Sequence, residues 1–97
     1  MIYLVTSNQR LFKSELYELM SKEEALKIIL SWDVVQFDTE TTGRDPHICR
    51  LLCSQFGNKK ADTQIVVDNE TIHITYFKEV FETKLIIGHN LRIKFQP

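Results

Sequence analysis

The chain has 97 residues, of which 43% are hydrophobic and 26% are charged, and its formal net charge is −1. This length suits one small domain and is too short for two, and the composition is that of a folded rather than a disordered protein. A net charge near zero argues against a purely electrostatic nucleic-acid binder, but it leaves room for an enzyme with a local basic groove.

Neither a membrane segment nor a leader is evident in the sequence. No apolar run reaches the roughly 18–20 residues that a transmembrane helix needs. The first residues lack the basic start and the long apolar core of a signal peptide. We therefore expect a cytoplasmic protein without membrane contact.

The predicted elements begin with a strand at 2–7 and a connecting arm at 8–20. The clearest helix signal covers 21–32, where Ser21 and Glu24 have the spacing of a capping box. The remaining predicted elements are strands at 34–40, 50–57 and 63–68, an amphipathic helix at 74–83 and a short buried strand at 84–90.

This order of elements predicts an α/β fold with a mixed sheet. A polar loop of about five residues joins strands 50–57 and 63–68, which favours a hairpin. Together with strand 34–40 they form an antiparallel meander of three strands. Helix 74–83 then acts as a crossover that brings strand 84–90 in as a parallel neighbour.

Cys49 and Cys53 are three residues apart, a spacing that by itself suggests either a metal site or a disulfide. On one strand, both side chains point to the same face at a separation of roughly 13 Å, which is too far for a disulfide. We therefore expect two buried free thiols.

Asp38 and Glu40 end the apolar strand "VVQF" and point to the same side of it, because strand side chains alternate. Two close carboxylates repel each other, and a hard divalent cation such as Mg²⁺ or Mn²⁺ removes that penalty. Two such ions would serve phosphodiester hydrolysis. Taken alone, however, an Asp-x-Glu pair is common and often marks a solvated strand end.

The surrounding motifs resemble the 3′–5′ exonuclease domain of the DEDD superfamily, which has a ribonuclease H-like fold. The similarity is carried by "FDTETTGRDP" (37–46), the strand "RLLCSQFGN" (50–58), an acidic strand end, a helix and "LIIGHN" (85–90). It is greatest to the proofreading domain of phage or bacterial DNA polymerases of the polymerase I type, and covers about residues 22–95.

This resemblance implies that Asp38 and Glu40 are the catalytic, metal-binding acids. The substrate contacts that it implies, with the 3′ end of single-stranded DNA, belong to Thr41, Thr42, Gly43, His89 and Asn90. His89 is expected to contact substrate or to support the site rather than to take part in the chemistry.

Two further acids of the family have no counterpart in this sequence. In "GHNLRIKFQP" (88–97) the position of the second-motif Asp holds Lys94 or, with "RI" as an insertion, Gln96, and the chain ends before a third motif. We therefore expect one incomplete exonuclease-like domain over 1–97, with a truncated fold, a partial Mg²⁺ or Mn²⁺ site and weak or no activity.

Two alternatives remain open. One is a non-enzymatic module that keeps the fold and binds a polymerase region, a nucleic-acid end or a second copy of itself through an uncovered sheet face. The other is an ordinary α/β fold with a chance Asp-x-Glu pair. Several basic residues are expected on the surface, with phosphate contact as the alternative role: Arg44, Lys59, Lys60 and Arg92.

Overall fold

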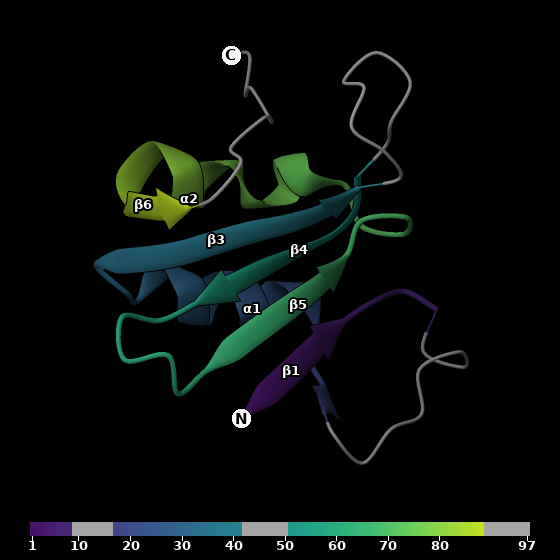
Figure 1. Ribbon diagram of the computed structural model, residues 1–97. Helices are drawn as coiled ribbons and strands as arrows, with labels where there is room; N and C mark the ends of the chain where they lie inside the picture. The colour runs from purple at the N-terminus through teal and green to yellow at the C-terminus, as the bar shows by residue number, and fades with distance from the viewer. Residues whose placement is uncertain (9–16, 42–50, 89–97) are drawn as a thin grey trace.

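The computed structural model describes residues 1–8, 17–41 and 51–88, which form one mixed sheet with its helices on one face (Figure 1). The elements are β1 (Ile2–Val5), β2 (Glu18–Leu19), α1 (Lys22–Leu30), β3 (Val34–Thr41), β4 (Leu51–Gly57), β5 (Gln64–Asp68), the 3₁₀ helix η2 (Ile74–Phe77), α2 (Lys78–Thr83) and β6 (Leu85–Gly88). Among these helices, none is long and apolar enough to cross a membrane.

The sheet has the strand order β2-β1-β5-β4-β3-β6. Strands β3, β4 and β5 pair antiparallel, and β6 pairs parallel with β3, as the order of elements predicts. The sequence does not reveal that β1 lies parallel to β5 and carries the two-residue β2 on its other side. Such pairings join segments far apart in the chain, and no short turn between the strands indicates them in the sequence.

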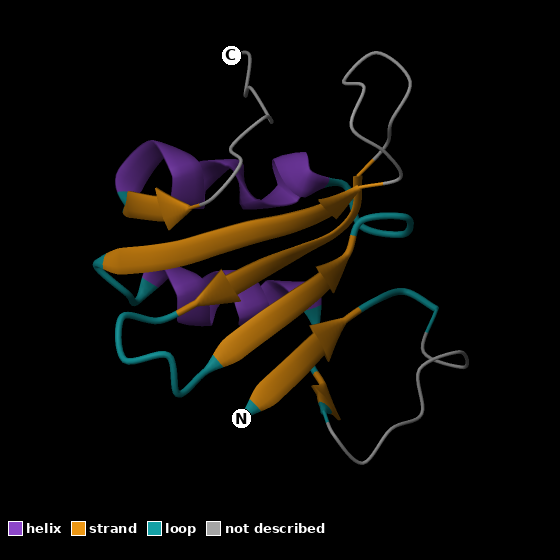
Figure 2. Ribbon diagram, viewed as in Figure 1, coloured by secondary structure: helices purple, strands orange, loops and turns teal. Residues whose placement is uncertain are grey.

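The helices predicted at 21–32 and 74–83 both form, but the structure differs from the prediction in where α1 begins and ends and in how the second helix is divided. Ser21 caps α1, its Oγ accepting a hydrogen bond of 3.1 Å from the Glu24 N–H, as the capping-box spacing predicts. The segment predicted as one helix at 74–83 is divided into η2 and α2 (Figure 2). His73 caps η2, because its Nδ1 accepts the Thr75 N–H, so this exposed histidine has a local structural role.

The turn between β4 and β5 is organised by Asn58. Its Oδ1 accepts hydrogen bonds from the backbone N–H groups of Asp62 and Thr63, at 3.1 and 3.3 Å. Its amide also donates to the Asp62 carboxylate, and this bond holds the pKa of Asp62 below its usual value. The hairpin predicted for strands 50–57 and 63–68 is therefore confirmed, with Asn58 at the centre of its turn.

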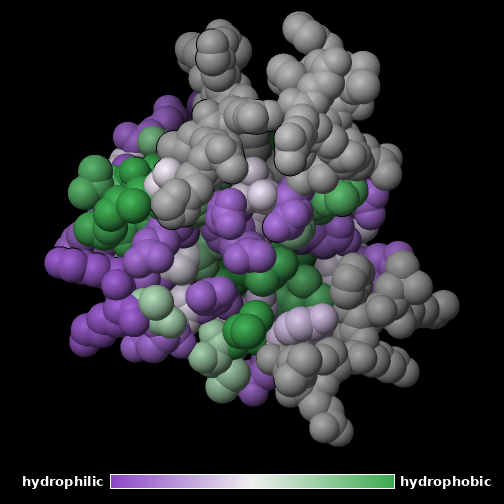
Figure 3. Space-filling view, viewed as in Figure 1, coloured by the Kyte–Doolittle hydropathy of each residue, from purple (hydrophilic) through white to green (hydrophobic). Residues whose placement is uncertain are grey.

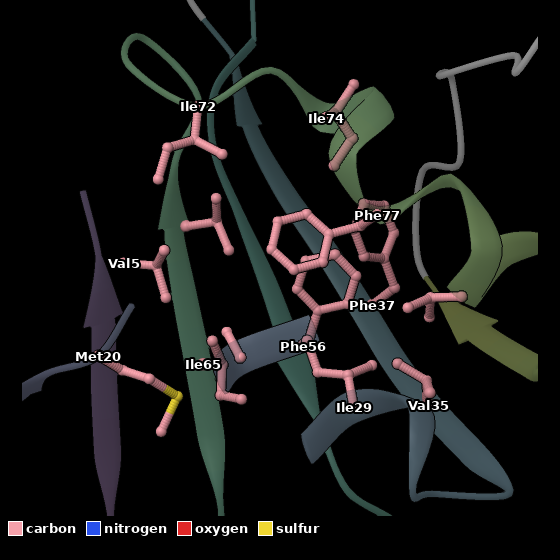
Figure 4. Close-up of a cluster of buried hydrophobic side chains, with 13 residues drawn as sticks. Val5, Met20, Ile29, Val35, Phe37, Phe56, Ile65, Ile72, Ile74 and Phe77 are labelled. Atoms are coloured by element: carbon pink, nitrogen blue, oxygen red, sulfur yellow. The ribbon is translucent and has the colours of Figure 1, made fainter. Parts of the chain in front are cut away.

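The core lies between the sheet and the two helices, and aromatic rings fill its middle (Figure 4). Phe37 of β3 and Phe56 of β4 face each other across the strands, with ring centroids 5.0 Å apart. Phe77 and Phe81 complete the cluster, at 5.1 Å from Phe56 and 4.8 Å from Phe37. Phe37 and Phe56 are both buried in this core.

The prediction of a buried strand at 84–90 is wrong for the part that the structure describes. Leu85 and Ile87 of β6 are 64% and 54% exposed, whereas Ile86 packs against the core. The reason is that the described helices cover one face of the sheet only. A continuous apolar run predicts burial on both faces, and here alternate residues face away from the core.

Phe56 is fully buried at the centre of the aromatic cluster. We expect Phe56→Ala to reduce the free energy of unfolding by about 3–5 kcal/mol, because it removes a large apolar side chain and leaves a cavity. Urea denaturation followed by circular dichroism measures this. Phe56→Leu should cost clearly less, and equal losses for the two variants would contradict the packing described.

Candidate active site

The two acids of "FDTET" lie at the carboxyl end of β3 and on the face opposite to the core. Val35 and Phe37 point into the core, while Asp38 and Glu40 are exposed on the other face. This division follows from the two-residue alternation of a strand. The structure therefore places both acids on one open surface, as the sequence predicts.

Pairing between β3 and β4 becomes irregular immediately after the acids. Glu40 is opposite Cys53, but Thr41 is opposite Leu51, so Leu52 is an extra residue in β4. The Leu52 carbonyl instead accepts a hydrogen bond from the Asn69 N–H at 3.0 Å. Such a bulge bends a strand and changes the direction of side chains, and bulges are frequent beside active sites.

The acid pair suits one hard cation better than two. Asp38 Oδ1 accepts a hydrogen bond from the Thr39 N–H at 2.8 Å, which orients the carboxylate. Carboxylate oxygens are the ligands that Mg²⁺ and Mn²⁺ prefer. Within residues 1–8, 17–41 and 51–88, however, no three histidine, cysteine or acidic side chains gather closely enough to form a fuller metal site.

Glu40, Cys53 and Asp68 form a row across β3, β4 and β5, because each is paired in register with the next. Cys53 is a half-buried free thiol, so the predicted free state is confirmed for it and the predicted full burial is wrong. Burial raises the pKa of the Cys53 thiol, and the negative charge of Glu40 raises it further. Cys49 lies outside the described residues.

Asp68, the residue of this row on β5, has a structural role. Its Oδ2 accepts hydrogen bonds from the hydroxyls of Thr6 and Thr71, at 2.7 and 3.0 Å, and its Oδ1 accepts the Glu70 N–H at 3.1 Å. Because Thr6 directly follows β1, this carboxylate ties the ends of β1 and β5 together. Its buried oxygens are occupied by protein donors, and a metal would have to displace them.

The other site residues implied by the resemblance lie beyond what the structure describes. The backbone of Thr41 belongs to β3, and its side chain lies outside the described part of the structure. Thr42, Gly43, His89 and Asn90 lie outside the described residues, as do Lys94 and Gln96. Their predicted roles stay predictions. What the structure does establish is that β6 ends at Gly88, which is paired with Phe37, the residue before Asp38.

A polar trough that the sequence did not reveal continues from Asp38 along the open face. It has a volume of about 210 Å³, and Gln36, Gln55 and Gln64 contribute to its lining. They come from three adjacent strands, and only the register of β3, β4 and β5 brings them together. The order apolar, polar, apolar at positions 35–37 could have indicated that Gln36 faces away from the core, but not which residues are its neighbours.

Comparison with known proteins shows the fold. No protein-family model matches the sequence, and no curated protein matches it. The catalytic core of RRP6 from Trypanosoma brucei has a TM-score of 0.61 at 14% identity, over 91% of this chain and 21% of that one. RNase D from the same organism, in complex with RNA U12, has a TM-score of 0.60 at 13% identity, over 94% and 30%.

The chain has a ribonuclease H-like fold. It spans between a fifth and a third of the length of these two proteins. The mixed α/β sheet expected from the sequence is confirmed. At this level of identity the likeness is one of fold, so the activities of the longer proteins enter below as a proposal only.

The effect of the Glu40 charge on the pKa of Cys53 can be tested by measuring how fast the Cys53 thiol is alkylated. In the Cys49→Ser background with a chelator present, we expect Glu40→Gln to increase the rate of Cys53 alkylation near pH 8. Loss of the negative charge lowers the thiol pKa, so more thiolate is present below that pKa. Glu79→Gln, on α2, serves as the control, and an equal increase there would contradict the Glu40 effect.

Proposed function

We propose that this chain is a 3′–5′ exonuclease-like domain that binds the 3′ end of a single nucleic-acid strand through a divalent cation held by Asp38 and Glu40. One observation carries the proposal: two exposed acids share one face near the carboxyl end of β3, beside the bulge in β4. Their position within a fold shared with the RRP6 catalytic core and RNase D supports it.

The cation, when bound, would neutralise the phosphate charge and polarise the scissile bond. The chain itself supplies two carboxylates that repel each other when no cation is present, and Asp38 is oriented by the Thr39 N–H. A complete two-metal clamp needs more acids than this pair. We therefore expect slow hydrolysis or none, with strand binding as the principal function.

The kind of nucleic acid is part of the proposal. The sequence motifs resemble DNA-polymerase proofreading domains, which favours a single-stranded DNA end and a polymerase region as partner. The RNase D whose fold this chain shares was observed in complex with RNA U12. That complex makes RNA an equal candidate, so each binding assay should include single-stranded DNA and single-stranded RNA.

Loss of one acid should abolish cation-dependent binding. We expect Mn²⁺ to bind with a dissociation constant on the order of 10⁻³ M, because few protein ligands are present. Asp38→Ala should remove Mn²⁺ binding, Mn²⁺-dependent binding of labelled single strands, and any strand shortening. Calorimetry, fluorescence anisotropy and denaturing gels measure the three effects.

Asp33→Asn is the matched control, because Asp33 is an exposed acid immediately before the other end of β3. Wild-type binding that persists unchanged in Asp38→Ala would contradict the assignment of the site. Rapid degradation of a strand that depends on Asp38 would instead contradict the expectation of weak activity, while supporting the exonuclease assignment.

A second candidate is self-association through the sheet face that the described helices leave open. The observation that favours it is the exposure of Leu85 and Ile87, side by side on the outward face of β6. Apolar side chains of this size on an edge strand are typical of protein contacts. The candidate is weakened by the polar residues in the middle of the same face, including Gln36 and Asp38.

If this second candidate is correct, the chain should run as a dimer at low micromolar concentration, and Ile87→Glu should make it monomeric. Size-exclusion chromatography with light scattering distinguishes these states. Glu82→Gln, on the exposed side of α2, is the control. A monomeric wild-type protein under the same conditions would remove this candidate.

A further inference from the structure

The trough beside Asp38 is built from side chains that a covered sheet face would not carry. Gln36, Gln55 and Gln64 come from β3, β4 and β5, and Gly57 leaves space between them, since it has no side chain. Within the part of the chain that the structure describes, none of these three amide groups has a hydrogen-bond partner. They are therefore available to a ligand.

The trough also separates two apolar areas of the open face. Leu85 and Ile87 are exposed on the β6 side, and Ile2 is exposed on the β1 side, next to the buried Leu4. Figure 3 shows hydrophilic residues in the middle of this face between hydrophobic areas. A face that another protein layer covers would be apolar across its middle strands, so the polar middle points to a polar ligand.

The charges of the lining residues restrict the chemistry of that ligand. Among the described residues that line the trough, Asp38 is the one charged residue, and none of them is a lysine or an arginine. A phosphate would therefore be repelled, while neutral amides offer both hydrogen-bond donors and acceptors. Such groups match the edge of a nucleobase, and Ile87 adds an apolar wall for the flat face of the ring.

We propose that this trough accepts an unpaired nucleobase of the strand whose 3′ end lies at Asp38 and Glu40. The base enters edge first, its donors and acceptors meet the glutamine amides, and the phosphates remain outside. A paired base cannot do this, because its Watson–Crick edge is already occupied. The inference rests on the proposed function and adds that the single strand, of DNA or RNA, is recognised through an unpaired base.

The test uses the full chain, with Mn²⁺ and short fluorescent strands of DNA and of RNA, each compared with a strand of the same length that lacks bases near its 3′ end. We expect wild type to bind the base-bearing strands about 5- to 10-fold more tightly than the abasic ones. This factor corresponds to one or two net hydrogen bonds. Duplexes should bind no better than abasic strands.

Gln55→Leu keeps the size of the side chain and removes its hydrogen bonds, so it should make base-bearing and abasic strands bind alike. Gln55→Glu is the second variant: it keeps nearly the same shape, and its charge should weaken binding of base-bearing strands. Leu85→Ala, on the same face but not among the trough residues, should behave as wild type. Thermal melting checks that each variant is folded.

The outcomes separate this inference from the proposed function. If Asp38→Ala abolishes binding while both Gln55 variants keep the preference for bases, the trough assignment is overturned and the acid site stands. If wild type binds no single strand at any Mn²⁺ concentration tested, both the proposed function and the trough assignment are refuted. A preference for bases on one kind of strand only would support the trough and decide between DNA and RNA.

Discussion

The antiparallel register between β3 and β4 is the constraint on which both the stability and the candidate site depend. It brings Phe37 against Phe56 on the core side and Asp38 beside Gln55 on the open side. A shift of one residue in β3 would exchange the two faces, exposing the phenylalanine and burying the carboxylates. Because a buried unpaired carboxylate costs several kcal/mol, the aromatic cluster and the acid pair favour the same register.

Local patterns were enough to predict most of the fold. Residues 34–37 form a mainly apolar run, and 21–24 carry a helix cap, so each element could be located without its partners. The placement of β1 and β2 beyond β5 could not be found this way. It depends on contacts such as the hydrogen bond between Thr6 and Asp68, which are 62 residues apart.

The exposure of β6 shows a second limit of prediction from sequence, which concerns burial. "LIIG" has the composition of a buried strand, and composition does not show whether a second layer covers the sheet. In the described part of the chain both helices pack on the face that carries Phe37 and Phe56. The alternate residues Leu85 and Ile87 therefore face outward, although their side chains are as apolar as those in the core.

The candidate site was predictable only in the part that is contiguous in sequence. Asp38 and Glu40 are two residues apart on one strand, so their common face follows from strand geometry alone. The bulge at Leu52 and the row from Glu40 to Asp68 required the pairing of strands. Asp68 was visible as an acidic strand end, yet its function as a tie between β1 and β5 depends on donors at positions 6 and 71.

The charges of the open face imply an order of events for any bound strand. Asp38 and Glu40 repel phosphate, and no lysine or arginine of the described residues lines the adjacent trough. In the proposed function, the attraction for a nucleic-acid end would therefore come from a metal ion held by the acids, whose charge offsets theirs. The neutral amides of the trough would act only at short range, on an unpaired base, after the end is held. Affinity would then depend on the metal, and selectivity for unpaired strands on the trough.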